Sequence, residues 1–453
     1  MPTAVVLHLR TILLMIFLRK GGMMKILLIS ENRTTTLVSP FPLGLAFVAG
    51  SLRQAGHEVN VLDFMFLEEW QEKLCNTLND FQPDAIGLSI RNIDNQDMRN
   101  PVFFLSDHLE IVRAVRRYSN ALIILGGSGF NIHPAGCLRY LDTDFGIYGE
   151  GEKAFPKLLS SIKTAEFFNI PGAVWKKDNK IIINPPDYIS DLNKWASPSF
   201  KDFDVTAYHE AKSELPGCIT VQNKRGCHMK CIYCSTPFLE GTHCRLRDTR
   251  QSVKEMAALN REKNIQRFYV VDNVFNFPLS NAKDFCREII TQGLKVSWQA
   301  ILNPAFSDEE LFELMAKAGC RFISLGNESG HELILKNLRK GFTLENVRKA
   351  ARIARANGIR FGCFLLLGGP GETQDTVKQS VEFVEELSPD LVTLKAGIRI
   401  YPGTQLETLA RDEGMIGNDR DLLYPAFYIS SAIREWVWDY LEKTVNNRGN
   451  WKF

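Results

Sequence analysis

Short apolar runs alternate with amphipathic segments twice along this chain, and that alternation limits the possible folds more than any other feature of the sequence. Strands that alternate with helices predict a parallel α/β sheet covered by helices on both faces. In the first stretch, amphipathic segments such as Leu43–Gln54 and His108–Tyr118 separate the apolar runs. The runs themselves are Lys25–Ile29, Val59–Asp63, Ala85–Ser89, Leu122–Leu125 and Phe145–Tyr148. We therefore expect an amino-terminal, doubly wound domain.

The second stretch repeats the pattern with six apolar runs, which are Ile219–Val221, Phe268–Val271, Val296–Ala300, Phe322–Leu325, Arg360–Leu367 and Leu391–Ala396. The helical segments between them include Ser252–Lys263, Ser307–Ala318, Leu344–Asn357 and Thr376–Leu387. Ser307 and Glu310 have the spacing of a capping box, and Gly319 and Gly358 stand where helix ends favour a left-handed residue. Six such units predict a partial (β/α)6 TIM-like barrel with its active site at the carboxyl ends of the strands.

The chain divides into five expected segments. Residues 1–23 form a leader or misassigned start that we expect to be disordered, with a membrane-surface anchor as the alternative. Residues 24–165 form the doubly wound (Rossmann or flavodoxin-like) domain, and the proline-rich residues 166–213 form a linker in which Ala173–Trp175 and Lys180–Asn184 could pair. Residues 214–406 form the barrel domain. Residues 407–453 form a helical carboxyl-terminal extension.

Charge and cysteine usage exclude some function classes. The chain of 453 residues has 54 Lys and Arg against 52 Asp and Glu, a net charge of +2, so we expect no nucleic-acid partner. The apolar run near residues 11–18 is too short to span a bilayer, and we expect no membrane contact. Ten cysteines are too few for a disulfide scaffold in a chain of this length, and three of them cluster, which favours a reducing, cytoplasmic location.

The cysteine cluster carries the strongest chemical signal. Cys227, Cys231 and Cys234 form a C-x3-C-x2-C run directly after the first strand of the predicted barrel. Three thiolates on one loop can hold three irons of a [4Fe–4S] cluster and leave the fourth iron open to a small ligand. Two alternatives stay open at this point. One is a structural zinc site completed by His228 or Cys244, and the other is three unrelated cysteines of the core.

In this motif the chain resembles the radical S-adenosylmethionine (SAM) enzymes, whose signature is C-x3-C-x2-C after the first barrel strand. The resemblance covers about residues 216–406. It implies that Cys227, Cys231 and Cys234 are the cluster ligands and the catalytic residues, and that Tyr233 lies near the adenine of SAM. In that family SAM chelates the open iron, and one electron from the cluster cleaves it to a 5′-deoxyadenosyl radical.

Two further motifs of the barrel resemble the SAM-binding motifs of the same family. The run Gly326–Gly330 resembles the fourth-strand motif, which makes Glu328 and Ser329 candidates for contacts to ribose and methionine. The turn containing Gly368 and Gly369 resembles the glycine turn after the fifth strand, although a simple tight turn is the alternative. Asp272 could contact the SAM amino group or cap a helix. Arg245 and Arg247 could hold the SAM carboxylate or face solvent.

The amino-terminal domain resembles the cobalamin-binding domain of the B12-dependent branch of that family. The residues that carry the resemblance stand at strand ends of the predicted sheet. We expect cobalamin contacts from Ser89, Arg91, Asn92, Gly126, Gly127, Gly149 and Glu150. No Asp-x-His-x-x-Gly motif follows the first strand, where residues 31–36 stand instead. We therefore expect no imidazole from this loop on cobalt, and Arg91 is a candidate for its lower face.

The two resemblances together imply a cobalamin-dependent radical SAM methyltransferase that acts on an unactivated carbon of a small-molecule or peptide substrate. The methyl group would come from methylcobalamin after the 5′-deoxyadenosyl radical abstracts hydrogen. Flavodoxin or ferredoxin would supply electrons. The alternatives are ring formation, rearrangement or oxidation without methyl transfer, polar methyl transfer without a substrate radical, and a cobalamin sensor with an inactive barrel. Tyr424, Phe427 and Tyr428 could line a substrate pocket or belong to the core.

Overall fold

The computed structural model describes residues 22–34, 38–162, 167–177, 180–212, 216–418, 421–446 and 448–453. These form two compact units. The first comprises residues up to Asn95, residues 103–217 and residues 238–240, and the second comprises residues 96–102, 218–237 and 241–453. Most of the expected leader, residues 1–21, lies outside the described residues. Among the described helices, none has the length and apolarity needed to cross a bilayer.

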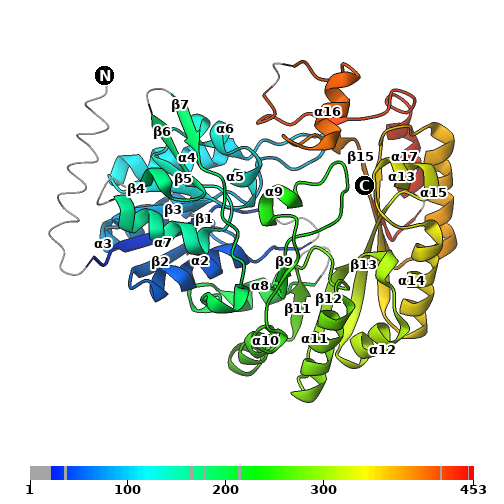
Figure 1. The fold of residues 1–453 in the computed structure, drawn as a ribbon, viewed down its shortest axis with the longest axis horizontal. Coiled ribbons are helices and arrows are strands. Elements are labelled where there is room, and N and C mark those ends of the chain that lie inside the picture. Colours follow the sequence, from blue (N-terminus) through cyan, green and yellow to red (C-terminus); the bar gives the residue numbers. More distant parts are fainter. Residues whose placement is uncertain are drawn as a thin grey trace. The chain divides into compact units, whose positions relative to one another are not determined.

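The first unit contains a seven-stranded sheet in the order β2-β1-β3-β4-β5-β6-β7 (Figure 1). Its parallel strands are β1 (Lys25–Ser30), β2 (Glu58–Asp63), β3 (Ala85–Ser89), β4 (Leu122–Gly126) and β5 (Phe145–Ile147). Five of the six β1 residues are buried, which is the pattern of a parallel strand covered on both faces. The expected doubly wound domain is therefore present.

The helices of the first unit connect and cover these strands. They are α2 (Leu43–Gln54), α3 (Trp70–Phe81), α4 (Leu105–Tyr118), α5 (Ser128–Ile132), α6 (Pro134–Leu141), α7 (Gly151–Ile162) and α8 (Val205–Glu210), with short 3-10 turns at Phe167–Asn169, Leu192–Lys194 and Phe200–Asp202. Helix α2 packs against α7, and α4 packs against both α3 and α6.

The segment expected as a linker supplies part of this sheet. Strand β6 (Ala173–Lys177) pairs antiparallel with β5 and with β7 (Lys180–Ile183), so the hairpin extends the sheet. The sequence favours a connector over residues 166–213, because prolines interrupt every periodic pattern there. Strand β6 pairs along the edge of β5, and its three apolar residues, Ala173, Val174 and Trp175, are buried there.

The second unit contains a seven-stranded sheet, β8-β11-β12-β13-β14-β15-β18, in which every pair is parallel. The strands are β8 (Ile219–Val221), β11 (Arg267–Val270), β12 (Ser297–Leu302), β13 (Cys320–Glu328), β14 (Arg360–Leu367), β15 (Leu391–Ala396) and β18 (Trp451–Lys452). Two short antiparallel pairs accompany it, β9 (Lys224–Arg225) with β10 (Arg245–Leu246) and β16 (Ile398–Arg399) with β17 (Phe427–Tyr428).

The crossover helices of this barrel are α10 (Thr249–Lys263), α11 (Leu279–Thr291), α12 (Glu309–Lys317), α13 (Glu332–Asn337), α14 (Leu344–Ala356) and α15 (Gln374–Leu387) (Figure 1). Helix α9 (Thr236–Glu240) follows the cysteine run, a 3-10 turn covers Pro304–Phe306, and α16 (Gln405–Asp412) and α17 (Val437–Asn446) come last. Gly319 and Gly358 have φ angles of 91° and 68°, so the expected left-handed helix ends are present.

Two expectations for the barrel need correction. The carboxyl-terminal segment is not only helical, because it contributes β17 and the last strand of the sheet, β18. The expected capping box at Ser307 is absent, since Asp308 is the N-cap of α12 and its Oδ1 accepts a hydrogen bond from the Leu311 N–H at 2.9 Å. The Ser307 hydroxyl instead donates to the Pro304 carbonyl.

Candidate functional site

The cysteine run lies in the loop after β8 and β9 in the second unit. Cys227, Cys231 and Cys234 are half-buried. The Cys227 N–H donates to the Gly241 carbonyl at 3.2 Å, and the Cys234 N–H donates to the Cys231 carbonyl at 3.3 Å, so the loop curls back on itself. In the described part of the chain, no three His, Cys, Asp or Glu side chains converge as a ready metal site. The loop thus supplies three thiols from one segment.

The electrostatics of the loop centre on Cys231. Burial raises the pKa of this thiol to about 11, and the nearby Lys340 ammonium acts in the opposite direction. Deprotonating such a thiol needs a compensating cation, which an iron–sulfur cluster would supply.

A buried carboxylate fixes the backbone just before the cysteine run. Asp272, which follows β11, is fully buried, and its Oδ1 accepts hydrogen bonds from the N–H groups of Asn223 at 2.8 Å and Lys224 at 3.1 Å. The Lys224 ammonium donates to the carbonyls of Phe275 and Phe277, both at 2.6 Å, and lies 3.8 Å from Asp272 Oδ2. Asp272 therefore holds the start of the loop and caps no helix.

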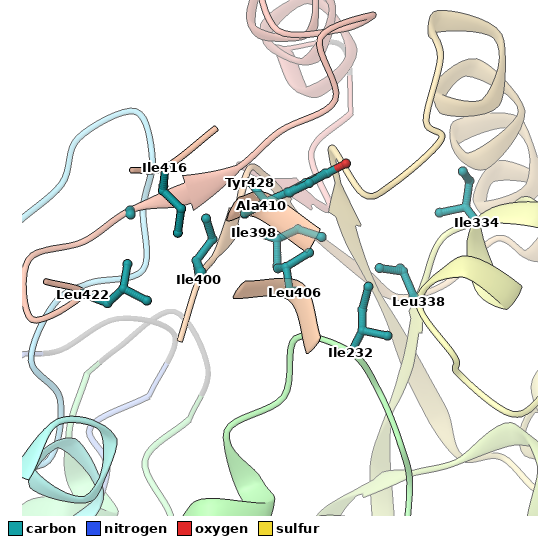
Figure 2. Packing of buried hydrophobic residues seen from close by; sticks show 11 residues of the cluster. Ile232, Ile334, Leu338, Ile398, Ile400, Leu406, Ala410, Ile416, Leu422 and Tyr428 are labelled. Carbon is teal, nitrogen blue, oxygen red and sulfur yellow. The ribbon is translucent and has the colours of Figure 1, made fainter. Parts of the chain in front are cut away.

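Apolar packing fixes the other end of the cysteine run. Ile232 belongs to a buried cluster that joins the loop to α13, α16 and the β16–β17 pair (Figure 2). Its members are Ile232, Ile334, Leu338, Ile398, Ile400, Leu406, Ala410, Ile416, Leu422, Ala426 and Tyr428. The Ile232 N–H donates to the Leu338 carbonyl at 3.2 Å, and the Leu406 N–H donates to the Ile232 carbonyl at 3.0 Å.

This packing decides the role of one of the aromatic residues that could line a substrate pocket. Tyr428 is buried in the cluster, and its hydroxyl donates to Glu413. Tyr424 is 52% exposed. The cluster thus makes Tyr428 a core residue.

Glu328, at the carboxyl end of β13, forms an ion pair inside the barrel. Its Oε1 lies 3.1 Å from Lys340 Nζ, and the same ammonium donates to the Tyr233 hydroxyl at 3.0 Å. Glu328 has a φ angle of 61°, a left-handed conformation that is unusual for a side chain of this size. Such backbone strain persists where the surrounding structure enforces it, which is common at functional sites.

Several buried polar atoms at the same strand end have no hydrogen-bond partner. They are both amide atoms of Asn327, Glu328 Oε2 and His331 Nδ1. Asn327 is fully buried, so each unpaired amide atom costs free energy unless a ligand or water satisfies it. Donors and acceptors of this kind fit the ribose hydroxyls and the amino acid group of SAM.

Ser329 and the glycine turn make internal contacts instead. The Ser329 hydroxyl lies 3.0 Å from the Ser380 hydroxyl of α15 and accepts a hydrogen bond from the His331 N–H. The N–H groups of Gly368 and Gly369 both donate to Glu372 Oε2. These amides are therefore occupied by the protein, and a Cβ atom at Gly368 would lie 2.9 Å from Ile429 Cγ1.

Burial raises the pKa of Glu372 to about 7, and its two amide partners only partly oppose this shift. Its other oxygen, Oε1, has no hydrogen-bond partner. Arg247 is also internal, because it is buried and its guanidinium bonds both oxygens of Glu255 and the Gln222 carbonyl. It therefore does not face solvent.

In the first unit, the glycines expected to contact cobalamin border the loop after β3. Gly127 has a φ angle of 99°, and a Cβ there would lie 2.6 Å from the Ile90 carbonyl. The Ser128 hydroxyl donates to the Arg91 carbonyl at 2.7 Å. Strand ends β1, β3 and β4 stand in register here, with Ser30 opposite Ser89 and Ser89 opposite Gly126.

The end of β5 is tied to neighbouring loops. Asn131 bonds both the N–H and the carbonyl of Gly149, which has a φ angle of 97°. Glu150 is buried, and its Oε2 accepts a hydrogen bond from the Ile189 N–H at 2.6 Å. Both residues therefore shape the edge of the sheet.

The end of β1 carries polar groups that the sequence prediction did not select. Asn32 Nδ2 is buried without a hydrogen-bond partner, and His108 Nε2 lies 3.4 Å from Glu31 Oε2. Burial raises the pKa of Glu31 to about 7. Unsatisfied polar atoms at the carboxyl edge of a doubly wound sheet fit a polar ligand such as the corrin side chains of cobalamin.

Sequence reasoning missed Lys340, Asn327 and Glu372. Asn327 stands next to Glu328 in a motif that the sequence does mark, but its unsatisfied amide is visible only in the structure. Lys340 follows Arg339 in a segment that resembles an exposed loop, and its partner Tyr233 is 107 residues away.

Comparison with known proteins identifies both units. The family model described as the B12 binding domain matches residues 33–159, and that of the radical SAM superfamily matches residues 224–384. Together they cover well over half of the chain. The chain belongs to the cobalamin-dependent radical SAM enzymes. Proteins of this family bind cobalamin and SAM, the two cofactors in the family name, and a [4Fe–4S] cluster as the third cofactor.

Among relatives of this family, the chain is 26% identical to tryptophan 2-C-methyltransferase of Streptomyces laurentii, over 85% of this chain and 74% of that protein. It is 24% identical to the anaerobic magnesium-protoporphyrin IX monomethyl ester cyclase of Rubrivivax gelatinosus, over 77% of this chain and 63% of that protein. The solved structure of the radical SAM methyltransferase TsrM from Kitasatospora setae, with tryptophan and a SAM analogue bound, matches with a TM-score of 0.81 at 23% identity. That match covers 92% of this chain and 88% of the other, and it confirms the predicted fold.

Proposed function

We propose that this enzyme transfers a methyl group to an unactivated carbon of a small-molecule or peptide substrate. The single observation that carries the proposal is the pairing of a three-cysteine loop with unsatisfied polar atoms of Asn327 and Glu328 in one barrel. The similarity to methyltransferases supports methyl transfer as the reaction. When bound, the cluster and SAM supply a 5′-deoxyadenosyl radical, and cobalamin supplies the methyl group.

The residues have different roles in this proposal. Cys227, Cys231 and Cys234 hold the cluster, and they need a reducing environment, which favours a cytoplasmic location and an electron donor such as flavodoxin or ferredoxin. Tyr233 and Glu328 face SAM, with Asn327 as an additional contact. The remaining predicted SAM residues shape the barrel around this position, namely Asp272, Ser329, Gly368 and Gly369.

In the first unit, we propose that the carboxyl edge of the sheet binds cobalamin. Ser89 and the loop with Arg91 and Asn92 contact the corrin, and Gly126, Gly127, Gly149 and Glu150 set the shape of that edge. No cobalt ligand comes from the loop after β1 in this proposal. Electron paramagnetic resonance of the cob(II)alamin form tests it, because nitrogen superhyperfine splitting from a protein imidazole would contradict it.

A cofactor census and a product analysis test the function. The full chain, purified and reconstituted without oxygen, is expected to hold one cobalt and one [4Fe–4S] cluster, and to form 5′-deoxyadenosine when reduced with SAM. Cys231→Ala should lose the cluster and this product, whereas Cys75→Ala, a half-buried cysteine of the first unit, should retain both. A tetrahedral zinc in place of iron would refute the proposal.

Radical ring formation is the second candidate, because the chain also matches a cyclase over much of its length. The mass of the product distinguishes the two reactions. A product that is heavier than substrate by one methylene group indicates methyl transfer, and a product that has lost hydrogen indicates ring formation or oxidation. Methylated product without 5′-deoxyadenosine would indicate polar methyl transfer.

A further inference from the structure

Lys340 lies between the cysteine loop and the carboxyl end of β13, and its ammonium is buried. The residue is 8% exposed. Its Nζ lies 3.1 Å from Glu328 Oε1 and 3.0 Å from the Tyr233 hydroxyl. The same atom lies 5.7 Å from the ring centroids of Tyr233 and Phe342. The Lys340 ammonium thus contacts Tyr233, which lies between two predicted cluster ligands. It also contacts Glu328, which is predicted to contact SAM.

We propose that Lys340 is a positioning residue that aligns Glu328 and Tyr233 for SAM. The inference rests on the proposed function, since it assumes that the loop holds a cluster and that SAM binds beside it. Lys340 itself does not have to touch SAM for this role.

The charge of Lys340 keeps Glu328 useful as an acceptor. A carboxylate buried without a cation would take up a proton, and its free oxygen would then no longer be a strong acceptor. The ammonium bonds Oε1 and leaves Oε2 without a hydrogen-bond partner. Burial acts to lower the pKa of Lys340, but the nearby Glu328, Tyr233 and Cys231 groups together outweigh it and raise that pKa well above its usual value. The Lys340 ammonium therefore keeps its charge at neutral pH.

The hydrogen bond to Tyr233 connects this carboxylate to the cysteine loop. Tyr233 lies between Cys231 and Cys234, and its ring is among the partly buried groups packed on the cluster of Figure 2. The neighbouring residue Ile232 donates its N–H to the Leu338 carbonyl, two residues before Lys340. Segment 338–340 thus holds the loop by one backbone and one side-chain hydrogen bond, which fixes the ring relative to Glu328.

The test measures SAM binding in cluster-loaded, full-length protein that contains cobalamin. Lys340→Met removes the charge and keeps most of the side-chain volume, and Lys340→Arg keeps the charge. Lys336→Met is the matched control, because Lys336 is an exposed lysine on the adjacent helix α13. The readouts are iron per chain, the dissociation constant for SAM by equilibrium dialysis without reductant, and the change that SAM causes in the resonance spectrum of the reduced cluster.

Lys340→Met is expected to bind SAM about tenfold more weakly, which corresponds to the loss of one hydrogen bond to a charged group. The spectral change on adding SAM should shrink with it. Lys340→Arg should recover part of the affinity, and Lys336→Met should match the wild type. A cluster-loaded Lys340→Met protein with wild-type affinity and spectrum would overturn the inference.

A double variant covers the case in which the buried, unpaired Glu328 prevents folding of Lys340→Met. Lys340→Met with Glu328→Gln removes both charges, and it should load iron yet bind SAM as weakly as expected for the single variant. Wild-type affinity of the loaded double variant would overturn the inference. If neither variant loads iron while Lys336→Met loads normally, Lys340 has a structural role only, and the inference is also overturned. If the wild type holds no cluster or binds no SAM, the proposed function itself fails.

Discussion

Replacing Asp272 with alanine tests how the start of the cysteine loop is held. The substitution leaves the buried N–H groups of Asn223 and Lys224 without their acceptor. Each unsatisfied N–H costs about 1–3 kcal/mol. The Lys224 ammonium also loses the carboxylate 3.8 Å away, but it keeps two carbonyl acceptors. Breaking this buried pair therefore costs about 3 kcal/mol, the lower end of the usual range. The sum is a destabilisation of about 5–9 kcal/mol.

Urea denaturation, followed by circular dichroism, measures this loss as a fall in the free energy of unfolding. Asp272→Asn keeps an oxygen that can accept both N–H groups, so it should lose only about 1–2 kcal/mol. Asp375→Ala is the control, because that carboxylate is exposed on the first turn of α15, and it should change stability by at most about 0.5 kcal/mol. An Asp272→Ala protein that unfolds at the wild-type urea concentration with an unchanged slope would refute the reasoning.

Three further predictions concern the packing of the second unit. The raised pKa of Glu372 means that the folded state holds a proton that the unfolded state releases, so the contribution of this group to stability is present below about pH 4.5 and is lost as the pH rises to about 7. Glu372→Gln should therefore gain up to about 3 kcal/mol relative to the wild type between pH 4.5 and 8, measured by urea denaturation at each pH, and a constant difference would contradict this. Leu406→Ala should lower the free energy of unfolding by about 2–4 kcal/mol, because it opens a cavity beside Ile232. A loss below about 1 kcal/mol would show that the hydrophobic cluster does not hold the cysteine loop. Gly330→Ala should lower the melting temperature, because the added Cβ would lie only 2.7 Å from Ser380 Cα of α15 and would clash with it. An unchanged melting temperature would mean that α15 can shift to make room for the added Cβ without loss of stability.

The sequence predicted both sheets because their strands are continuous apolar runs. Runs such as Lys25–Ile29 and Arg360–Leu367 are buried on both faces, and this burial requires apolar residues at successive positions. Strand β18 could not be found in this way. It has two residues, Trp451 and Lys452, and only its pairing with β15 makes it a strand.

The candidate site was predictable in its ligands but not in its supporting contacts. The spacing of Cys227, Cys231 and Cys234 is local, so the sequence shows it directly. Lys340 is different, because its hydrogen-bond partner Tyr233 is 107 residues away in the chain. The glycine turn was also marked by its sequence, but its amides donate to Glu372, and a hydrogen bond of this kind depends on the fold of the turn.

The order of the strands has a consequence for synthesis of the protein. Strand β18 pairs with β15, but about fifty residues separate the two strands in the chain, including α16 and α17. Until a ribosome has released that whole stretch, β15 presents an unpaired edge on a nascent barrel. A nascent chain that stalls between these strands would therefore offer a hydrogen-bonding edge to its neighbours, and chaperones that cover such edges would be most useful at this stage.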